Sequence, residues 1–105
     1  MEYDRADKEV AEMSKIKVNE QRAVDEFQEL TAIDAPSFGE RQMADRLIVK
    51  LEELGFEVEE DNAGKHFGGN AGNLYAYLSG NLPGDPVLLS GHMDTVEPSK
   101  GKKGI

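Results

Sequence analysis

The sequence predicts an α/β fold, with two helices in the N-terminal half followed by three strands. Two observations indicate this class. Apolar residues recur at helical spacing up to Leu54 and then at strand-like positions. The last predicted strand, 87–90, begins with three successive apolar residues, which is typical of a strand buried on both faces. A strand of that kind needs covering helices, as α/β proteins provide.

The first predicted helix follows a charged N-terminal extension, residues 1–17, whose thin apolar stripe also has helical spacing. Asn19 is a suitable N-cap, and apolar residues then recur every three or four positions as far as Ile33. Pro36 disfavours helical backbone at Ala35. The helix is therefore expected to end before Asp34.

The second predicted helix covers about residues 38–54. Ser37-Phe38-Gly39-Glu40 matches a capping box, in which the Ser hydroxyl and the Glu carboxylate each accept a backbone N–H. Gly55 stands where a helix C-terminus usually places glycine. Between them runs the clearest amphipathic stripe of the chain: Met43, Ala44, Leu47, Ile48, Leu51 and Leu54.

Three short segments with strand character follow. Residues 56–59 alternate between apolar and charged, as a half-exposed strand does. Residues 61–73 are rich in Gly and Asn and predict a long turn. Residues 74–78 carry aromatic side chains suited to a second strand. A tight turn at 82–86 leads into the third strand, 87–90.

Composition and charge exclude several classes of function. The chain has 105 residues, with 12 Lys plus Arg against 21 Asp plus Glu, and a net charge of −9. Such a surface argues against binding nucleic acid or an anionic membrane. The absence of cysteine excludes disulfides and thiolate metal sites. The acidic N-terminus has no apolar core, which argues against a secretory signal. We therefore expect a cytoplasmic location.

The residues that point to chemistry are His92 and Asp94, directly after the apolar third strand. In α/β proteins, ligands bind at that end of a strand. Side chains two positions apart point the same way in extended backbone. An imidazole can bind zinc, and a neighbouring carboxylate can orient it. By spacing alone, however, such a pair is more often a strand-end histidine and an aspartate that caps a turn.

The surrounding residues resemble a known family. Leu-Leu-Ser-Gly-His-Met-Asp-Thr-Val-Glu-Pro (88–98) resembles the first metal-binding motif of the co-catalytic zinc exopeptidases. That superfamily includes the tripeptide aminopeptidase peptidase T, dipeptidases, carboxypeptidases and aminoacylases. Further segments resemble the family in the same order: 30–37 with Glu40, 51–58, and 61–64 with 72–74. The turn 68–73 and the ending Glu97-Pro98 favour the peptidase T-like branch.

The resemblance implies a fold and a function for residues 18–105. They would be the N-terminal portion of a zinc peptidase catalytic domain with a mixed sheet, truncated after the His-x-Asp motif. His92 would be a zinc ligand and Asp94 the catalytic acidic residue. The full-length enzyme would bind two zinc ions and remove residues from the N-terminus of short peptides. Because the other ligands and the general base lie beyond this chain, we expect it to bind zinc only weakly and to be inactive alone.

Two alternatives stay open. The same motif would suit a dipeptidase, carboxypeptidase or deacylase of this superfamily. An alternative of another class is a non-catalytic α/β protein that self-associates into a homo-oligomer. An apolar third strand without covering helices leaves an exposed sheet edge, through which copies could pair.

Overall fold

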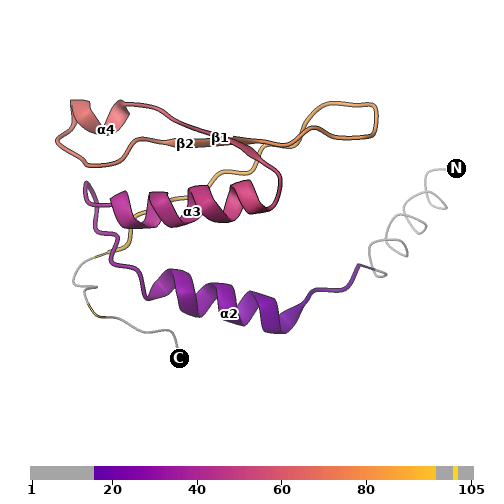
Figure 1. Ribbon diagram of the computed structural model, residues 1–105, viewed down its shortest axis with the longest axis horizontal. Coiled ribbons are helices and arrows are strands. Elements are labelled where there is room, and N and C mark those ends of the chain that lie inside the picture. The colour runs from indigo at the N-terminus through magenta and orange to yellow at the C-terminus, as the bar shows by residue number, and fades with distance from the viewer. Residues whose placement is uncertain (1–15, 97–100, 102–105) are drawn as a thin grey trace, which may run out of the picture.

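The structure is a computed structural model that describes residues 16–96 and 101. Its elements in order are α2 (Glu20–Thr31), α3 (Arg41–Glu53), β1 (Glu57–Glu60), α4 (Ala63–His66) and β2 (Leu74–Tyr77). Figure 1 shows α3 between α2 on one side and the β1–β2 hairpin on the other. Nearly all of the extension predicted over 1–17 lies outside the described residues. The mixed helix-and-strand character predicted from the sequence is confirmed.

Helix α2 begins where the sequence predicts. The Arg22 backbone N–H donates to the Asn19 side-chain oxygen at 3.1 Å, which satisfies an N–H that the helix itself leaves unpaired. The helix ends at Thr31, ahead of Pro36 as expected.

Ion pairs, rather than a buried apolar face, join α2 to α3. The Lys50 ammonium lies 2.8 Å from the Glu26 carboxylate and 2.6 Å from that of Glu29, and Arg46 also pairs with Glu29 at 2.6 Å. These contacts lower the pKa of Glu29, with Lys50 as the largest cause. No residue of α2 is buried, and Phe27 is 57% exposed. Exposed ion pairs contribute little to stability, so α2 is weakly held.

Helix α3 carries the core and packs against both strands of the hairpin. The predicted stripe is largely confirmed: Met43 and Ala44 are buried, whereas Leu54 is 54% exposed. The helix starts at Arg41, later than the predicted 38, because Phe38 has a φ of +69°, which no α-helix accommodates. It ends as predicted, since Gly55 adopts a φ of +95° that glycine tolerates best.

The hairpin is antiparallel, with Glu57 opposite Tyr77 and Glu60 opposite Leu74. The connection between its strands holds one turn of helix, α4, which the sequence does not predict. Asp61 closes this connection, because its carboxylate accepts the backbone N–H groups of Ala63 and Asn73 at 3.0 and 2.7 Å. A Cβ on Gly72 would lie 1.9 Å from the Asp61 carbonyl oxygen, so only glycine fits there.

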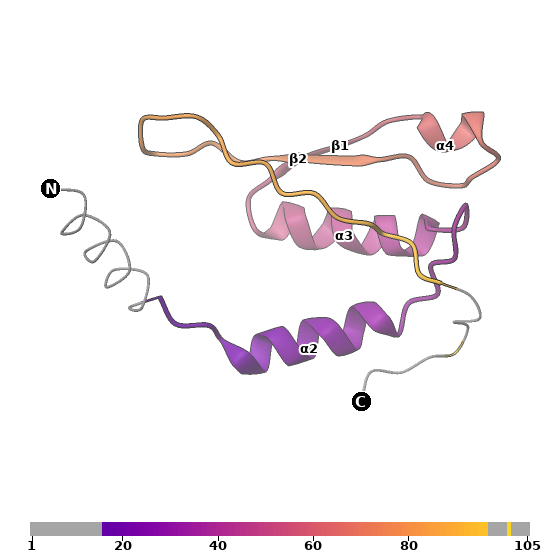
Figure 2. The ribbon, with the colours of Figure 1, turned by 180° about the vertical axis from the view of Figure 1, so that it is seen from behind.

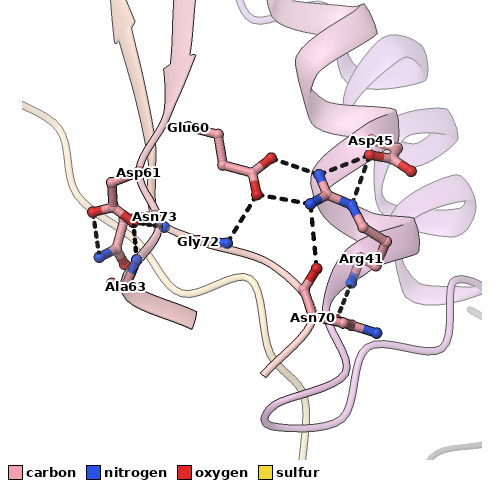
Figure 3. Close-up of polar contacts among 8 residues, drawn as sticks. All are labelled: Arg41, Asp45, Glu60, Asp61, Ala63, Asn70, Gly72 and Asn73. Atoms are coloured by element: carbon pink, nitrogen blue, oxygen red, sulfur yellow. Dashed lines mark hydrogen bonds and ion pairs between the residues drawn. The ribbon is translucent and has the colours of Figure 1, made fainter. Parts of the chain in front are cut away.

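Arg41 ties α3 to the hairpin (Figure 3). Its guanidinium donates to both carboxylate oxygens of Glu60 at 2.7 and 2.6 Å, and to Asp45 at 2.9 Å. The Glu60 carboxylate also accepts the Gly72 N–H at 2.9 Å. Bidentate pairs of this geometry are stronger than single charged hydrogen bonds. Together, Arg41 and Gly72 lower the pKa of Glu60 to about 2, with Arg41 as the largest cause.

The predicted third strand is wrong for the described chain. Residues 87–90 are extended but pair with no strand, and Val87, Leu88 and Leu89 are 85%, 90% and 88% exposed. The prediction of burial on both faces fails because a strand forms only beside a hydrogen-bonding neighbour, and within residues 16–96 none lies along it. Among the described residues, no helix is long and apolar enough to cross a membrane.

The Arg41–Glu60 pair makes stability depend on pH. Because folding lowers the pKa of Glu60 from 4.5 to about 2, its contribution is fully present above pH 4.5 and is lost as pH falls toward 2. The two side chains are 36% and 23% exposed, so solvent screening reduces the contribution to about 1–2 kcal/mol. We expect Glu60→Gln to cost about this much at pH 7, measured by urea unfolding.

Glu59 provides the matched control, since it lies on the same strand and forms no ion pair with a described residue. Glu59→Gln should leave stability and its pH dependence unchanged. Equal losses in the two variants would show that the Arg41 pair is not the cause.

Candidate functional site

His92 and Asp94 lie at the end of the extended segment that follows the hairpin. Figure 2 shows this segment leading from the hairpin to the turn that precedes α3. The His92 Nδ1 lies 3.6 Å from the Asp94 Oδ1, so the two side chains face each other as their spacing predicts. The His92 side chain is 94% exposed and that of Asp94 35%. The imidazole is thus presented to solvent while the carboxylate is partly enclosed.

The loop before α3 holds Asp94 in place. The Ser37 hydroxyl donates to Asp94 Oδ2 at 2.6 Å, across a sequence separation of 57 residues. The next residue, Thr95, donates its backbone N–H to the Ala35 carbonyl at 2.7 Å, and Pro36 and Thr95 form an isolated parallel bridge. Ala35 is fully buried. Both the backbone and the side chain of the predicted site are therefore anchored to residues 35–37.

The predicted capping box is wrong for Ser37. Its hydroxyl binds Asp94 instead of the first turn of α3, and the observed N-cap, Glu40, makes no side-chain cap. The Glu40 carboxylate does reach back, but to the Phe38 N–H at 2.8 Å. The Asn70 side chain takes the capping role, since its oxygen accepts the Arg41 N–H at 2.9 Å. A tertiary contact thus replaces the local one.

A strained turn presents Ser37. The Gly39 N–H donates to the Pro36 carbonyl at 2.8 Å, which closes a β-turn with Phe38 as its third residue. Turns with positive φ at that position normally use glycine, whereas Phe38 adopts +69°. Such backbone costs about 1–3 kcal/mol and persists only where the surroundings hold it. Here Asn70 contributes, because its N–H donates to the Phe38 carbonyl at 3.2 Å.

The charge state of the pair follows from these contacts. The Ser37 hydrogen bond, more than the His92 imidazole, lowers the pKa of the Asp94 carboxyl below its ordinary value. Asp94 is therefore a carboxylate at neutral pH. A carboxylate facing Nδ1 favours the imidazole form that carries its proton there, which leaves the Nε2 lone pair outward.

The donor types suit zinc, but their number does not complete a site. A catalytic zinc takes about three protein ligands and a water. Within residues 16–96 and 101, no three His, Cys, Asp or Glu side chains come together to hold a metal ion. His66, the second histidine, lies at the end of α4 and is exposed. The described chain thus presents a possible ligand and its orienting carboxylate, not a whole metal centre.

Sequence reasoning missed the residues that support the pair: Ser37, Thr95 and Asn70. Ser37 matched a local capping pattern, and that pattern concealed its distant partner. Thr95 acts through its backbone N–H, and Asn70 acts through both its side-chain oxygen and its backbone N–H. Residue spacing predicts none of these contacts. The one available signal was that Ser37 and Asp94 belong to two segments that both resemble the same enzyme family.

Comparison with known proteins shows a similarity to a bacterial protein. The uncharacterized protein YqjE of Bacillus subtilis (strain 168) is 39% identical over 88 residues, which are 84% of this chain and 24% of YqjE. The chain therefore spans about a quarter of the length of the relative that it matches. No protein-family model matches the chain. No solved structure matches it either.

The strain at Phe38 can be measured. We expect Phe38→Gly to raise the free energy of unfolding by about 1 kcal/mol, because relief of the positive φ outweighs the entropic cost of glycine. Phe67→Gly is the control, since Phe67 is similarly exposed (73% against 60%) but has a φ of −118°. It should lower stability in the same urea titration. Destabilisation of similar size in both variants would contradict a strained turn.

Proposed function

We propose that this chain forms the N-terminal part of a zinc-dependent aminopeptidase that hydrolyses short peptides in the cytoplasm. The observation that carries the proposal is the anchored His92–Asp94 pair. Two segments that resemble the exopeptidase family, 30–37 and 88–98, meet at the Ser37–Asp94 hydrogen bond of 2.6 Å. A chance match of separate motifs would give no reason for that contact.

The proposed roles follow from the geometry. His92, with its imidazole 94% exposed, would bind zinc through Nε2. Asp94 would hold the imidazole in the orientation that this requires. When bound, zinc activates a water molecule and polarises the peptide carbonyl. The remaining ligands and the general base would come from residues outside this chain. The match to a quarter of YqjE is compatible with such a division.

A fusion tests the proposal. This chain would replace the matching quarter of YqjE, and the fusion would be assayed with zinc and a tripeptide that has a free N-terminus. We expect hydrolysis from the N-terminus, and a loss of more than about 100-fold with His92→Ala, because ligand removal costs more than the loss of an orienting partner. His66→Ala is the matched control and should retain activity. The 105-residue chain alone should show no turnover.

The substrate panel separates the related activities. A dipeptide, an N-blocked dipeptide and an N-acyl amino acid would be included in the same assay. Preference for one of these would replace the aminopeptidase assignment with a dipeptidase, a carboxypeptidase or a deacylase. Absence of zinc-dependent hydrolysis of every substrate, in a folded fusion, would contradict the peptidase proposal as a whole.

A second candidate function rests on a separate observation. The backbone of Val87–Gly91 makes no hydrogen bond to any described residue, and the three apolar side chains there are at least 85% exposed. Burying them contributes about 1.5–3 kcal/mol per side chain. Residues 78–93 contain Asp85 as their single acidic residue, in a chain of net charge −9. Two copies can thus approach there with least repulsion. We propose, as the alternative, a non-catalytic protein that self-associates through residues 87–91.

Sedimentation velocity tests self-association of the 105-residue chain. We expect the sedimentation coefficient to rise between about 10 and 500 µM, as a micromolar dimer requires. Leu88→Lys with Leu89→Lys should abolish the rise, since charged residues on an exposed edge prevent pairing. Phe67→Lys, which alters an exposed apolar residue at the other end of the hairpin, should leave it intact. A monomer at every concentration would eliminate this candidate.

A further inference from the structure

Ser37 is distant from the candidate site in the sequence, but its hydroxyl contacts one side chain of that site, the carboxylate of Asp94. Its hydroxyl lies 2.6 Å from Asp94 Oδ2, whereas the other carboxylate oxygen, Oδ1, lies 3.6 Å from His92 Nδ1. Oδ2 thus accepts a hydrogen bond, whereas Oδ1 faces the imidazole at a distance just beyond hydrogen-bond range. With Oδ2 fixed, rotation of the carboxylate is restricted, and Oδ1 stays on the imidazole side.

The backbone around Asp94 is held by other contacts. Thr95 bonds to Ala35 through its own N–H at 2.7 Å, and the Pro36–Thr95 bridge does not involve the Ser37 hydroxyl. Removal of that hydroxyl should therefore free the Asp94 side chain and leave its backbone in place. The strained turn at Phe38 gives a second indication, because strained backbone is concentrated at functional sites. It sets the direction of Ser37 in particular.

We propose that Ser37 is a positioning residue for the His92–Asp94 pair. Its hydroxyl holds one oxygen of Asp94, so that the other keeps the proton of His92 on Nδ1 and leaves Nε2 free for a metal ion. The part of this inference that concerns zinc rests on the proposed function. The part that concerns the imidazole does not, since it is a property of the metal-free chain.

NMR of the ¹⁵N-labelled 105-residue chain tests the inference. The ring nitrogens of both histidines are observed at about pH 9, above the range in which ordinary histidines titrate. His66 is the internal reference. We expect His92 to carry more of the Nδ1–H form than His66 does. In Ser37→Ala, the ratio of the Nδ1–H to the Nε2–H form of His92 should become that of His66. Ser37→Thr keeps a hydroxyl and should show the same ratio as the original chain. An unchanged Thr95 amide signal reports that the loop remains in place.

Zinc titration of the same samples gives the second measurement. We expect Ser37→Ala to weaken zinc binding at His92 by up to about tenfold, the lower end of the effect of partners of metal ligands. Ser37→Thr should bind as the original chain does. Unchanged His92 signals in Ser37→Ala would overturn the role of Ser37, even where zinc binds. The role of Ser37 would also be overturned if Ser37→Thr showed the same altered His92 signals as Ser37→Ala while its Thr95 amide signal stayed unchanged. A shift of the His92 signals without any zinc binding would remove the metal role and weaken the peptidase proposal, but not the positioning of the imidazole.

Discussion

The bidentate pair of Arg41 with Glu60 is the interaction on which the rest of the structure depends. Its two contacts, of 2.7 and 2.6 Å, join the first turn of α3 to the end of β1. Only Ala35, Met43 and Ala44 are buried apolar residues among those described, so the hydrophobic core is too small to set the geometry by itself. In a larger domain an exposed ion pair of this kind would matter little. Here it adds a direct tie between α3 and the hairpin to the small core that Met43 and Ala44 form.

The same residue connects the hairpin to the candidate site. The Arg41 backbone N–H donates to the Asn70 side chain, and the Asn70 N–H donates to the Phe38 carbonyl. This holds the turn at Phe38 in its positive-φ conformation, and the turn directs Ser37 toward Asp94. Each step is a single hydrogen bond, and a typical one contributes about 1 kcal/mol net. The site is therefore positioned by a series of weak contacts between loops.

The sequence predicts the parts of this fold that local interactions determine. The Asn19 side chain caps α2 through the backbone of a residue three positions later. The apolar stripe of α3 consists of residues three and four positions apart. The C-terminus of α3 depends on the φ of the glycine that follows Leu54. Predictions failed where a distant partner competes with a near one. Ser37 could satisfy either a helix terminus or a carboxylate 57 residues away, and a charged acceptor gives the stronger bond. The composition of the apolar run 87–89 predicts a strand, but strand formation also depends on a neighbouring strand.

The apolar run 87–89 and His92, the proposed zinc ligand, both lack partners among the described residues. Residues 87–89 need neighbouring strands to be buried, and His92 needs further ligands to hold zinc; within the described residues neither is present. Yet the two ends of this segment differ. Its apolar part makes no hydrogen bond to any described residue, whereas Asp94 and Thr95 are held to residues 35–37 by bonds of 2.6 and 2.7 Å. The His92–Asp94 pair is thus held in place although residues 87–91, which precede it, make no hydrogen bond to any described residue. The pair therefore needs no sheet beside residues 87–91 in order to be positioned, and so its geometry can be studied in this chain alone.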